Sequence, residues 1–349
     1  MFSRPERLTV GRVLIWAVAV IVVVGVVAGS WATLTSGRLS PSAWVLLMIA
    51  GVSQGAVYAL IALGYTLVYG VLFIVNFAHG EVFMMGAFTG MFVASGLAAT
   101  GLLADSPFIA LLIIFLAAML ASMIVAIVLE RVAYRPLRRA PRLVPLITAI
   151  GASLFLQYSA LGLFGARARR YPPVELLSGR IDVFGFSLTR IELVTIVASV
   201  VLMAALFYFI ERTRTGRAMR AVSEDKDVAA LMGINVDRVI VTTFAIGGLL
   251  AGAAGVLYSF LFNRVDFVMG LLPGIKAFTA AVLGGIGNIV GAMLGGLVLG
   301  IFENVGPALL LTGAGVPSTN QLRDVVAFSV LVLVLLFRPT GLLGRKENL

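Results

Sequence analysis

The sequence predicts an all-α polytopic membrane protein with about ten transmembrane helices. Of its 349 residues, 60% are hydrophobic and 12% are charged, and the mean hydropathy is +1.08. Several apolar runs reach the roughly 20 residues that an α-helix needs to cross about 30 Å of hydrocarbon. The basic residues gather in short loops between these runs, which is the pattern that sets orientation in a membrane. An ordinary soluble domain is therefore excluded.

The apolar runs, taken in order along the chain, define the predicted spans. They cover 13–34, 44–70, 81–103, 108–130, 143–165, 190–210, 239–261, 268–286, 288–305 and 322–337. The first run has about 22 residues, more than the roughly 7–15 of a signal-peptide core. We therefore expect an uncleaved span there, despite the small residues Ala28-Gly29-Ser30. Pro273 and the glycines at 284–287 interrupt the eighth and ninth runs, which also fit one broken span.

The loops favour ten spans over nine. Basic residues concentrate at 131–142, at 212–238 and in the tail at 338–346. With ten spans, the N-terminus, both loops and the tail all lie on the cytoplasmic side, where Lys and Arg are in excess. The predicted organisation is a charged start with an extra span at 1–40, a transmembrane domain at 41–344 and a tail at 345–349. The loop 166–189 then lies outside, and its alternating apolar residues predict a small hairpin.

A polar break separates the second and third spans. It contains Asn76, His79, Gly80 and Glu81, and His79 is the only histidine of the chain. Polar backbone at membrane depth is tolerated only where it is buried in protein or lines a water-filled cavity, and ionisable residues there mark a pathway or a site. The alternative is that both residues have a structural role. Glu81 would then interact with the positive end of the dipole of the following helix, and His79 would form hydrogen bonds with backbone groups left unpaired by the break.

A second break occupies a corresponding position in the other half of the chain. It is formed by Gly284, Gly285, Gly287 and Asn288. Paired interrupted segments in two halves are the sequence pointer to an inverted-repeat transporter, so both breaks are candidate parts of a translocation path. Glycines repeat at four-residue spacing from Gly287 through Gly291 to Gly295, which predicts close helix packing in lipid.

The segment 211–238 contains a predicted short amphipathic helix. Ser223 is its expected N-cap, and the adjacent acidic residues favour the positive end of the helix dipole. Gly233 supplies the left-handed stop. One face carries three apolar residues at i, i+3 and i+4 spacing: Val228, Leu231 and Met232. This stripe is available to the membrane, to the chain's own bundle or to a partner protein.

Several kinds of function are excluded or disfavoured. The chain has no cysteine and one histidine, which rules out disulfides, thiolate metal sites and multi-histidine metal centres. Gly270 to Lys276 lacks the spacing and the hydroxyl of a phosphate-binding loop, so no ATPase is encoded here. The sequence offers neither a nucleophile triad nor paired carboxylates, so it does not predict an enzyme. No cofactor is expected. The net charge of +10 lies in membrane-flanking loops, which argues against nucleic-acid binding. Scarce carboxylates within the spans disfavour a gradient-driven secondary transporter.

Blocks distributed over most of the chain resemble one family, the permeases of branched-chain amino-acid ABC importers. The quoted stretches are Gly51 to Gly70, Val75-Asn-Phe-Ala-His-Gly-Glu81, Glu130-Arg-Val-Ala-Tyr-Arg-Pro-Leu137, Leu146 to Gly151, Gly216 to Asp225, Leu231 to Arg238, Lys276 to Asn288 and Pro339-Thr-Gly-Leu-Leu-Gly344. Residues 1–40 and the loop 166–189 have no counterpart in this resemblance.

The resemblance implies a fold similar to the transmembrane subunits of type II ABC importers, in a bacterial cytoplasmic (inner) membrane. It implies a homologous second permease, two cytoplasmic ABC ATPases and an extracytoplasmic substrate-binding protein as partners. The segment 211–238 then resembles the loop that couples to the ATPase. The residues expected to couple are Arg217, Arg220, Glu224, Asp225, Val228, Leu231, Met232 and Gly233. A urea or short-amide importer, whose permeases share Ala78-His79-Gly80-Glu81, is the nearest alternative, and a secondary transporter is the alternative from another class.

Overall fold

The computed structural model describes residues 10–138, 140–141, 143–183, 185–313, 315–316, 319–338 and 340–344. The charged start up to residue 9, the loop arginines Arg139 and Arg142, and the tail 345–349 lie outside the described residues. The helices are α1 (Val10–Ser36), α2 (Pro41–Leu72), α3 (His79–Ala99), α4 (Leu102–Asp105), α5 (Pro107–Leu129), α6 (Leu143–Phe164), α7 (Arg190–Arg212), α8 (Arg214–Glu224), α9 (Lys226–Leu231), α10 (Val236–Phe262), α11 (Leu271–Gly284), α12 (Ile289–Leu311) and α13 (Arg323–Phe337). The strands are β1 (Arg180–Val183) and β2 (Phe186–Thr189).

The helical membrane character is confirmed. Within the described residues, seven helices are long and apolar enough to cross a membrane: α2, α3, α5 with its extension to Leu137, α6, α7, α10 and α12. The predicted spans at 13–34, 268–286 and 322–337 coincide with α1, α11 and α13. However, α11 has 14 residues, which is about 21 Å of helix, less than the roughly 30 Å of hydrocarbon. Among the described residues, length and composition therefore identify seven candidate spans and further, shorter apolar helices, and the count of ten stays a prediction.

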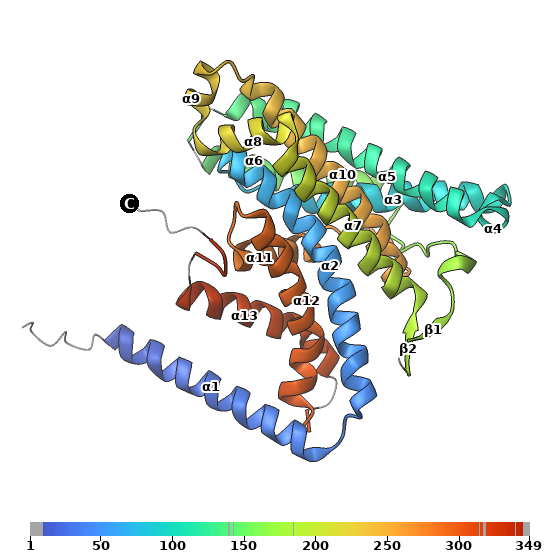
Figure 1. Ribbon diagram of the computed structural model, residues 1–349, viewed down its shortest axis with the longest axis vertical. Coiled ribbons are helices and arrows are strands. Elements are labelled where there is room, and N and C mark those ends of the chain that lie inside the picture. The colour runs from blue at the N-terminus through green and yellow to red at the C-terminus, as the bar shows by residue number, and fades with distance from the viewer. Residues whose placement is uncertain are drawn as a thin grey trace, which may run out of the picture.

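Helix α2 is the centre of the molecule, because almost every residue from Gly51 onward is buried. In Figure 1 it runs between two groups of helices, with α3, α5, α6, α7 and α10 on one side and α11, α12, α13 and α1 on the other. Gly55 lies against Gly296 and Gly300 of α12, where an added Cβ would meet backbone atoms. Small residues let helix backbones approach closely in lipid. Gly291 and Gly295 likewise lie against the backbone of α11, so the predicted glycine packing is confirmed for these two residues, whereas an added Cβ at Gly287 would meet nothing within 4 Å.

Helix α1 lies at the side of the bundle. Its last turns meet the end of α12, where Gly29 lies against the backbone of Leu310 and Thr33 Oγ1 accepts a hydrogen bond of 2.8 Å from the backbone N–H of Gly313. Val20, Val23, Val24, Val26 and Val27 are exposed, and Figure 1 shows this helix leaning away from the other helices.

The predicted hairpin in the loop 166–189 is confirmed. Strands β1 and β2 pair antiparallel, with Arg180 opposite Thr189. Its base is attached to the end of α10, because Arg169 and Val265 exchange backbone hydrogen bonds of 2.8 and 2.9 Å. Figure 1 places the hairpin and the helices α8 and α9 at opposite ends of the molecule.

The predicted cap of the amphipathic helix is wrong by two residues. Asp225 is the N-cap of α9, because its Oδ1 accepts the backbone N–H groups of Asp227 and Val228, each at 2.9 Å. Ser223 instead lies inside α8 and donates to the carbonyl of Arg220 at 2.7 Å. Because Ser223 has helical backbone within α8, it does not stand at the N-cap position of the next helix. Gly233 adopts φ +84° as predicted.

Candidate translocation site and coupling segment

The first break returns the chain into the bundle. Helix α2 ends at Leu72, Phe73 takes the left-handed conformation with φ 58°, and α3 starts at His79. An added Cβ at Gly64 of α2 would overlap the imidazole of His79, so the two residues lie side by side. Gly64 precedes Leu72 by eight residues, and eight residues of helix span about 12 Å. Residues 73–78 therefore run back along the last two turns of α2.

His79 and Asn76 stabilise this return. The His79 side chain is buried, with its ring edge-on to Tyr65 at a centroid distance of 4.9 Å, and its Nε2 has no hydrogen-bond partner among the described residues. Asn76 Oδ1 accepts a hydrogen bond of 2.6 Å from the hydroxyl of Tyr134. These contacts support the structural interpretation of both residues, because Asn76 satisfies a polar group in the bundle and the His79 ring is packed inside it.

Part of the carboxylate of Glu81 is unsatisfied. Its side chain is 0% exposed, and Oε1 accepts a long hydrogen bond of 3.4 Å from the hydroxyl of Ser153. Oε2 is buried and has no partner among the described residues. The backbone of Gly270, at the start of α11, lies beside this oxygen, and Gly274 lies against Gly80. Glu81 therefore lies where the first turns of α3 and α11 meet.

A cavity of about 200 Å³ opens at this point. Its wall comes from α2, the first break, α3, α6 and α11. The lining residues are Tyr65, Phe77, Glu81, Ile150, Ser153, Leu154, Gln157, Gly270, Leu271, Gly274 and Ile275. Most of this surface is apolar, and Glu81 is its one charged residue. The cavity reaches the surface of the chain beside α6, where Ile150 and Leu154 are 46% and 47% exposed.

The second break is closed by the C-terminal segment of the chain. Backbone N–H groups of Leu342 and Leu343 donate to the carbonyls of Leu283 and Gly284, at 2.8 and 3.0 Å. Asn288 links the C-terminal segment to the start of α12. Its Nδ2 donates to the carbonyl of Leu343 at 2.9 Å, and its Oδ1 accepts from the backbone N–H of Gly291 at 3.0 Å. The carbonyls at the end of α11, which a helix leaves unpaired, are thereby satisfied.

The conformation of this break requires glycine. Gly285 and Gly287 have φ +101° and +91°, values that residues with a Cβ rarely adopt. The structure places the two predicted breaks at opposite ends of α11, since Gly80 adjoins its start and Gly285 its end. They are not brought together into one site.

A buried polar cluster was not predicted as a site. Glu303 Oε1 accepts from Lys276 Nζ at 2.7 Å, from Gln54 Nε2 at 2.9 Å and from the hydroxyl of Tyr58 at 3.3 Å. Lys276 Nζ also lies 2.6 Å from Asp324 Oδ1. This cluster joins α2, α11, α12 and α13. The signal that could have found it is a lysine in an otherwise apolar stretch, since such residues are rare and pair with one another.

Helix α8 contacts the end of α2 and the second break together. A small cavity of about 70 Å³ is lined by Gly70 of α2, Met219 and Arg220 of α8, and Gly287 and Ile289 of the second break. The first break is reached as well, because Lys226 Nζ lies 5.4 Å from the ring centroid of Phe73. Burial, aided by the nearby Arg138, lowers the pKa of Lys226. The coupling segment therefore adjoins both breaks.

The apolar stripe of α9 has no partner within the described chain. Val228, Leu231 and Met232 are 54%, 86% and 78% exposed. The other predicted coupling residues, Arg217, Arg220, Glu224, Asp225 and Gly233, are also exposed.

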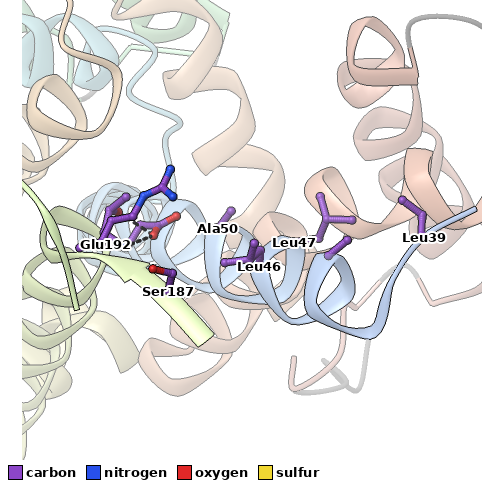
Figure 2. Close-up of a pocket in the computed structure, with 9 residues that line it drawn as sticks. Leu39, Leu46, Leu47, Ala50, Ser187 and Glu192 are labelled. Atoms are coloured by element: carbon purple, nitrogen blue, oxygen red, sulfur yellow. Dashed lines mark hydrogen bonds between the residues drawn. The ribbon is translucent and has the colours of Figure 1, made fainter. Parts of the chain in front are cut away.

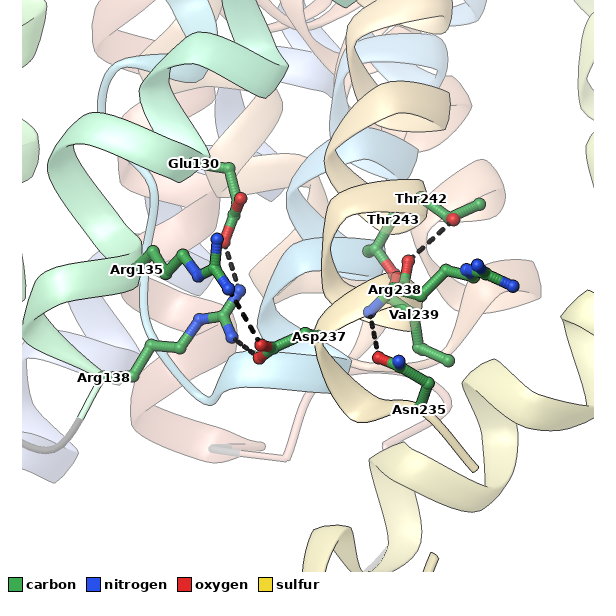
Figure 3. A network of polar contacts seen from close by, with 9 residues as sticks. All are labelled: Glu130, Arg135, Arg138, Asn235, Asp237, Arg238, Val239, Thr242 and Thr243. Atoms are coloured by element: carbon green, nitrogen blue, oxygen red, sulfur yellow. Dashed lines mark hydrogen bonds and ion pairs between the residues drawn. The ribbon is translucent and has the colours of Figure 1, made fainter. Parts of the chain in front are cut away.

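An ion-pair network fixes the basic loop after α5 to the start of α10 (Figure 3). Arg138 pairs with both Glu130 and Asp237, and Arg135 Nη2 lies 3.2 Å from Asp237 Oδ2. The first turn of α10 is capped by Asn235, whose Oδ1 accepts from the backbone N–H of Arg238 at 2.9 Å. The two basic loops of the sequence are thus held on one side of the molecule by shared acidic residues.

A larger cavity of about 490 Å³ lies at the other end of α2, between its first turns and the β-hairpin. Figure 2 shows Leu46 and Leu47 of α2 on one side and Ser187 and Glu192 on the other. Glu192 Oε2 accepts hydrogen bonds from the hydroxyl and backbone N–H of Thr189, at 2.6 and 3.1 Å, and so caps α7. Glu192 therefore has a structural role in starting α7.

Comparison with known proteins shows the family. Residues 47–335 match the family described as the branched-chain amino acid transport system permease component. The high-affinity branched-chain amino acid transport system permease protein BraD of Pseudomonas aeruginosa is 44% identical over 303 residues, covering 86% of this chain and 95% of that protein. The LivH permease proteins of Escherichia coli (strain K12) and Salmonella typhimurium are 43% identical over the same shares.

No solved structure matches the chain. The family match leaves α1 outside, while it contains both breaks, the cavity at Glu81 and the coupling segment. These features describe a multi-pass helical membrane protein with an exposed amphipathic helix. The chain therefore belongs to the permease components of branched-chain amino-acid ABC transport systems, which work with ATPase and binding-protein partners.

Proposed function

We propose that this chain is the transmembrane permease subunit of an importer that moves branched-chain amino acids into the cytoplasm, driven by ATP hydrolysis on separate subunits. A homologous second permease, two cytoplasmic ATPases and an extracytoplasmic binding protein complete the machine. The observation that carries this proposal is the exposed apolar stripe of α9 on a segment that adjoins both breaks. A movement of the coupling segment would therefore be transmitted directly to the end of α2 and the end of α11.

The path of the chain supports ten crossings in the inner membrane. Helix α10 starts beside α9 and ends at the base of the β-hairpin, at the opposite end of the molecule. Residues 263–284 then return, partly as loop and partly as α11, to the side of α8. The end of α12 meets the end of α1, and the C-terminal segment closes the second break near α8. Both termini then lie on the cytoplasmic side, together with the coupling segment.

In this arrangement α1 is an extra span beside the family's transmembrane domain, and the hairpin lies outside. The inverted-repeat relationship between the halves stays a prediction. The cavity at Glu81 is the candidate substrate-binding site on the translocation path, since its mostly apolar wall suits an aliphatic side chain. Burial of such a side chain is worth about 1.5–3 kcal/mol.

The test is ATP-dependent uptake of labelled L-leucine by the complete importer in proteoliposomes. We expect uptake with all partners present and none from this chain alone. Flux from the chain alone would support a gradient-driven transporter and overturn the proposal.

Two variants at one position test the coupling role of α9. Leu231→Asp places a charge on the exposed stripe, so we expect normal insertion with loss of both ATPase co-purification and uptake. Leu231→Met keeps the stripe apolar and serves as the matched control. Full uptake by a correctly inserted Leu231→Asp importer would remove the coupling role.

A further inference from the structure

The strongest unexplained feature of the molecule is the free oxygen of Glu81. The side chain is completely buried, yet Oε2 has no hydrogen-bond partner among the described residues. A buried carboxylate oxygen without a partner is costly, because its desolvation is not repaid by a hydrogen bond. Asn76 is satisfied by Tyr134. The buried Nε2 of His79 also has no partner among the described residues, but it lies against Gly64 of α2. Of these three residues, only Glu81 lines the cavity.

The chemistry of that wall suits a small ligand that has an apolar body and an ammonium group. None of the lining residues is basic, so the protein supplies no counter-charge to the carboxylate within the cavity. Around it are large apolar side chains, chiefly Ile150, Leu154 and Ile275. The volume of about 200 Å³ lies below the roughly 300 Å³ at which sites for drug-sized ligands begin. It suits a metabolite with a compact apolar body and one ammonium group.

We propose that Glu81 binds the α-ammonium group of the amino acid in transit, while the aliphatic side chain rests on Ile150, Leu154 and Ile275. Gln157, also in the wall, carries amide donors for the α-carboxylate. The inference rests on the proposed function and deepens it by naming the residue that recognises the substrate class. A charge-assisted hydrogen bond is the stronger kind in a dry site, so Glu81 distinguishes an amino acid from an equally apolar acid.

The position of Glu81 also connects binding to movement. Its carboxylate lies between the first turns of α3 and α11, beside the backbone of Gly270. The far end of α11 carries the second break, which adjoins α8. A ligand held at Glu81 therefore touches the helix whose other end meets the coupling segment.

The absence of cysteine from the chain allows a direct test by thiol labelling. Leu154→Cys, and separately Ile150→Cys, places a single thiol in the cavity wall of the complete, partner-bound importer. The rate of labelling by a small methanethiosulfonate reagent is then measured with L-leucine or with 4-methylpentanoate, which is leucine without its amino group. Leu46→Cys, in the separate cavity at the other end of α2 (Figure 2), is the matched control.

We expect L-leucine to slow labelling at positions 154 and 150 but not at 46. We expect 4-methylpentanoate to protect about tenfold less well or worse, because it lacks the group that the carboxylate binds. Adding Glu81→Gln, which keeps the shape and removes the charge, should raise the leucine concentration needed for protection by a similar factor. The comparison of the two ligands stands even if Glu81→Gln reduces the yield of the importer.

Two results would overturn the inference while leaving the proposed function intact. One is equal protection by leucine and 4-methylpentanoate. The other is an importer that takes up leucine but shows no leucine protection at position 154 or 150. Failure of leucine uptake by the unmodified complete importer would instead contradict the proposed function.

Discussion

Lys276 Nζ lies 2.7 Å from Glu303 Oε1, in a part of the bundle where both side chains are almost completely buried. The pair ties the short helix α11 to α12. Asp324 of α13 reaches the same ammonium group at 2.6 Å, and Gln54 and Tyr58 of α2 reach the same carboxylate oxygen. Side chains from four helices therefore meet at one ion pair.

Removing one member of this pair should destabilise the bundle strongly. Lys276→Met leaves Glu303 buried without its counter-charge, and breaking a buried pair in this way typically costs about 3–5 kcal/mol. We expect a clear drop in the midpoint of thermal unfolding of the purified importer. Lys276→Met combined with Glu303→Gln should recover much of the loss, because no buried charge then lacks a counter-charge and Asp324, whose side chain is about half exposed, remains in contact with solvent. Equal destabilisation by the single and double variants would contradict this account of the cluster.

The contact between Gly64 and His79 predicts a steric effect. Gly64→Ala places a Cβ where the imidazole now lies, so the first break cannot keep its position against α2. Overpacking of this kind costs about 1–3 kcal/mol, and we expect reduced yield and a lower unfolding midpoint. Gly151→Ala in α6, where an added Cβ meets nothing within 4 Å, is the control and should be neutral or slightly stabilising. The space argument fails if both variants behave alike.

The C-terminal segment should matter through its backbone. Leu342→Pro removes the N–H that donates to Leu283 at 2.8 Å and leaves a carbonyl at the end of α11 unpaired. An intramolecular hydrogen bond contributes about 0.5–1.5 kcal/mol, so we expect a modest loss of stability together with weaker ATP-dependent uptake. Leu342→Ala keeps the N–H and is the matched control. Identical uptake and unfolding midpoints for the two variants would show that this bond does not hold the second break.

Local signals in the sequence located the helix interruptions to within a few residues. The run Asn76 to Glu81 predicted the first break, whereas the structure interrupts the helices between Leu72 and His79, and His79, Gly80 and Glu81 form the first turn of α3. Positive φ at Gly285 and Gly287 likewise follows from residue type. The cap of α9 could be misplaced by two residues, because Ser223 and Asp225 are both good N-caps and only the packing of α8 chooses between them.

What the sequence determined by itself is the class of the molecule, its apolar helices, its breaks and its family, because these depend on composition, spacing and residue identity along the chain. The tertiary structure decided which residues meet. It placed the two breaks at opposite ends of α11, closed the second one with residues 340–344, paired Lys276 with Glu303 and left Glu81 Oε2 free beside an apolar cavity. Such contacts join residues far apart in the chain, and their partners follow from the packing of whole helices rather than from any local pattern.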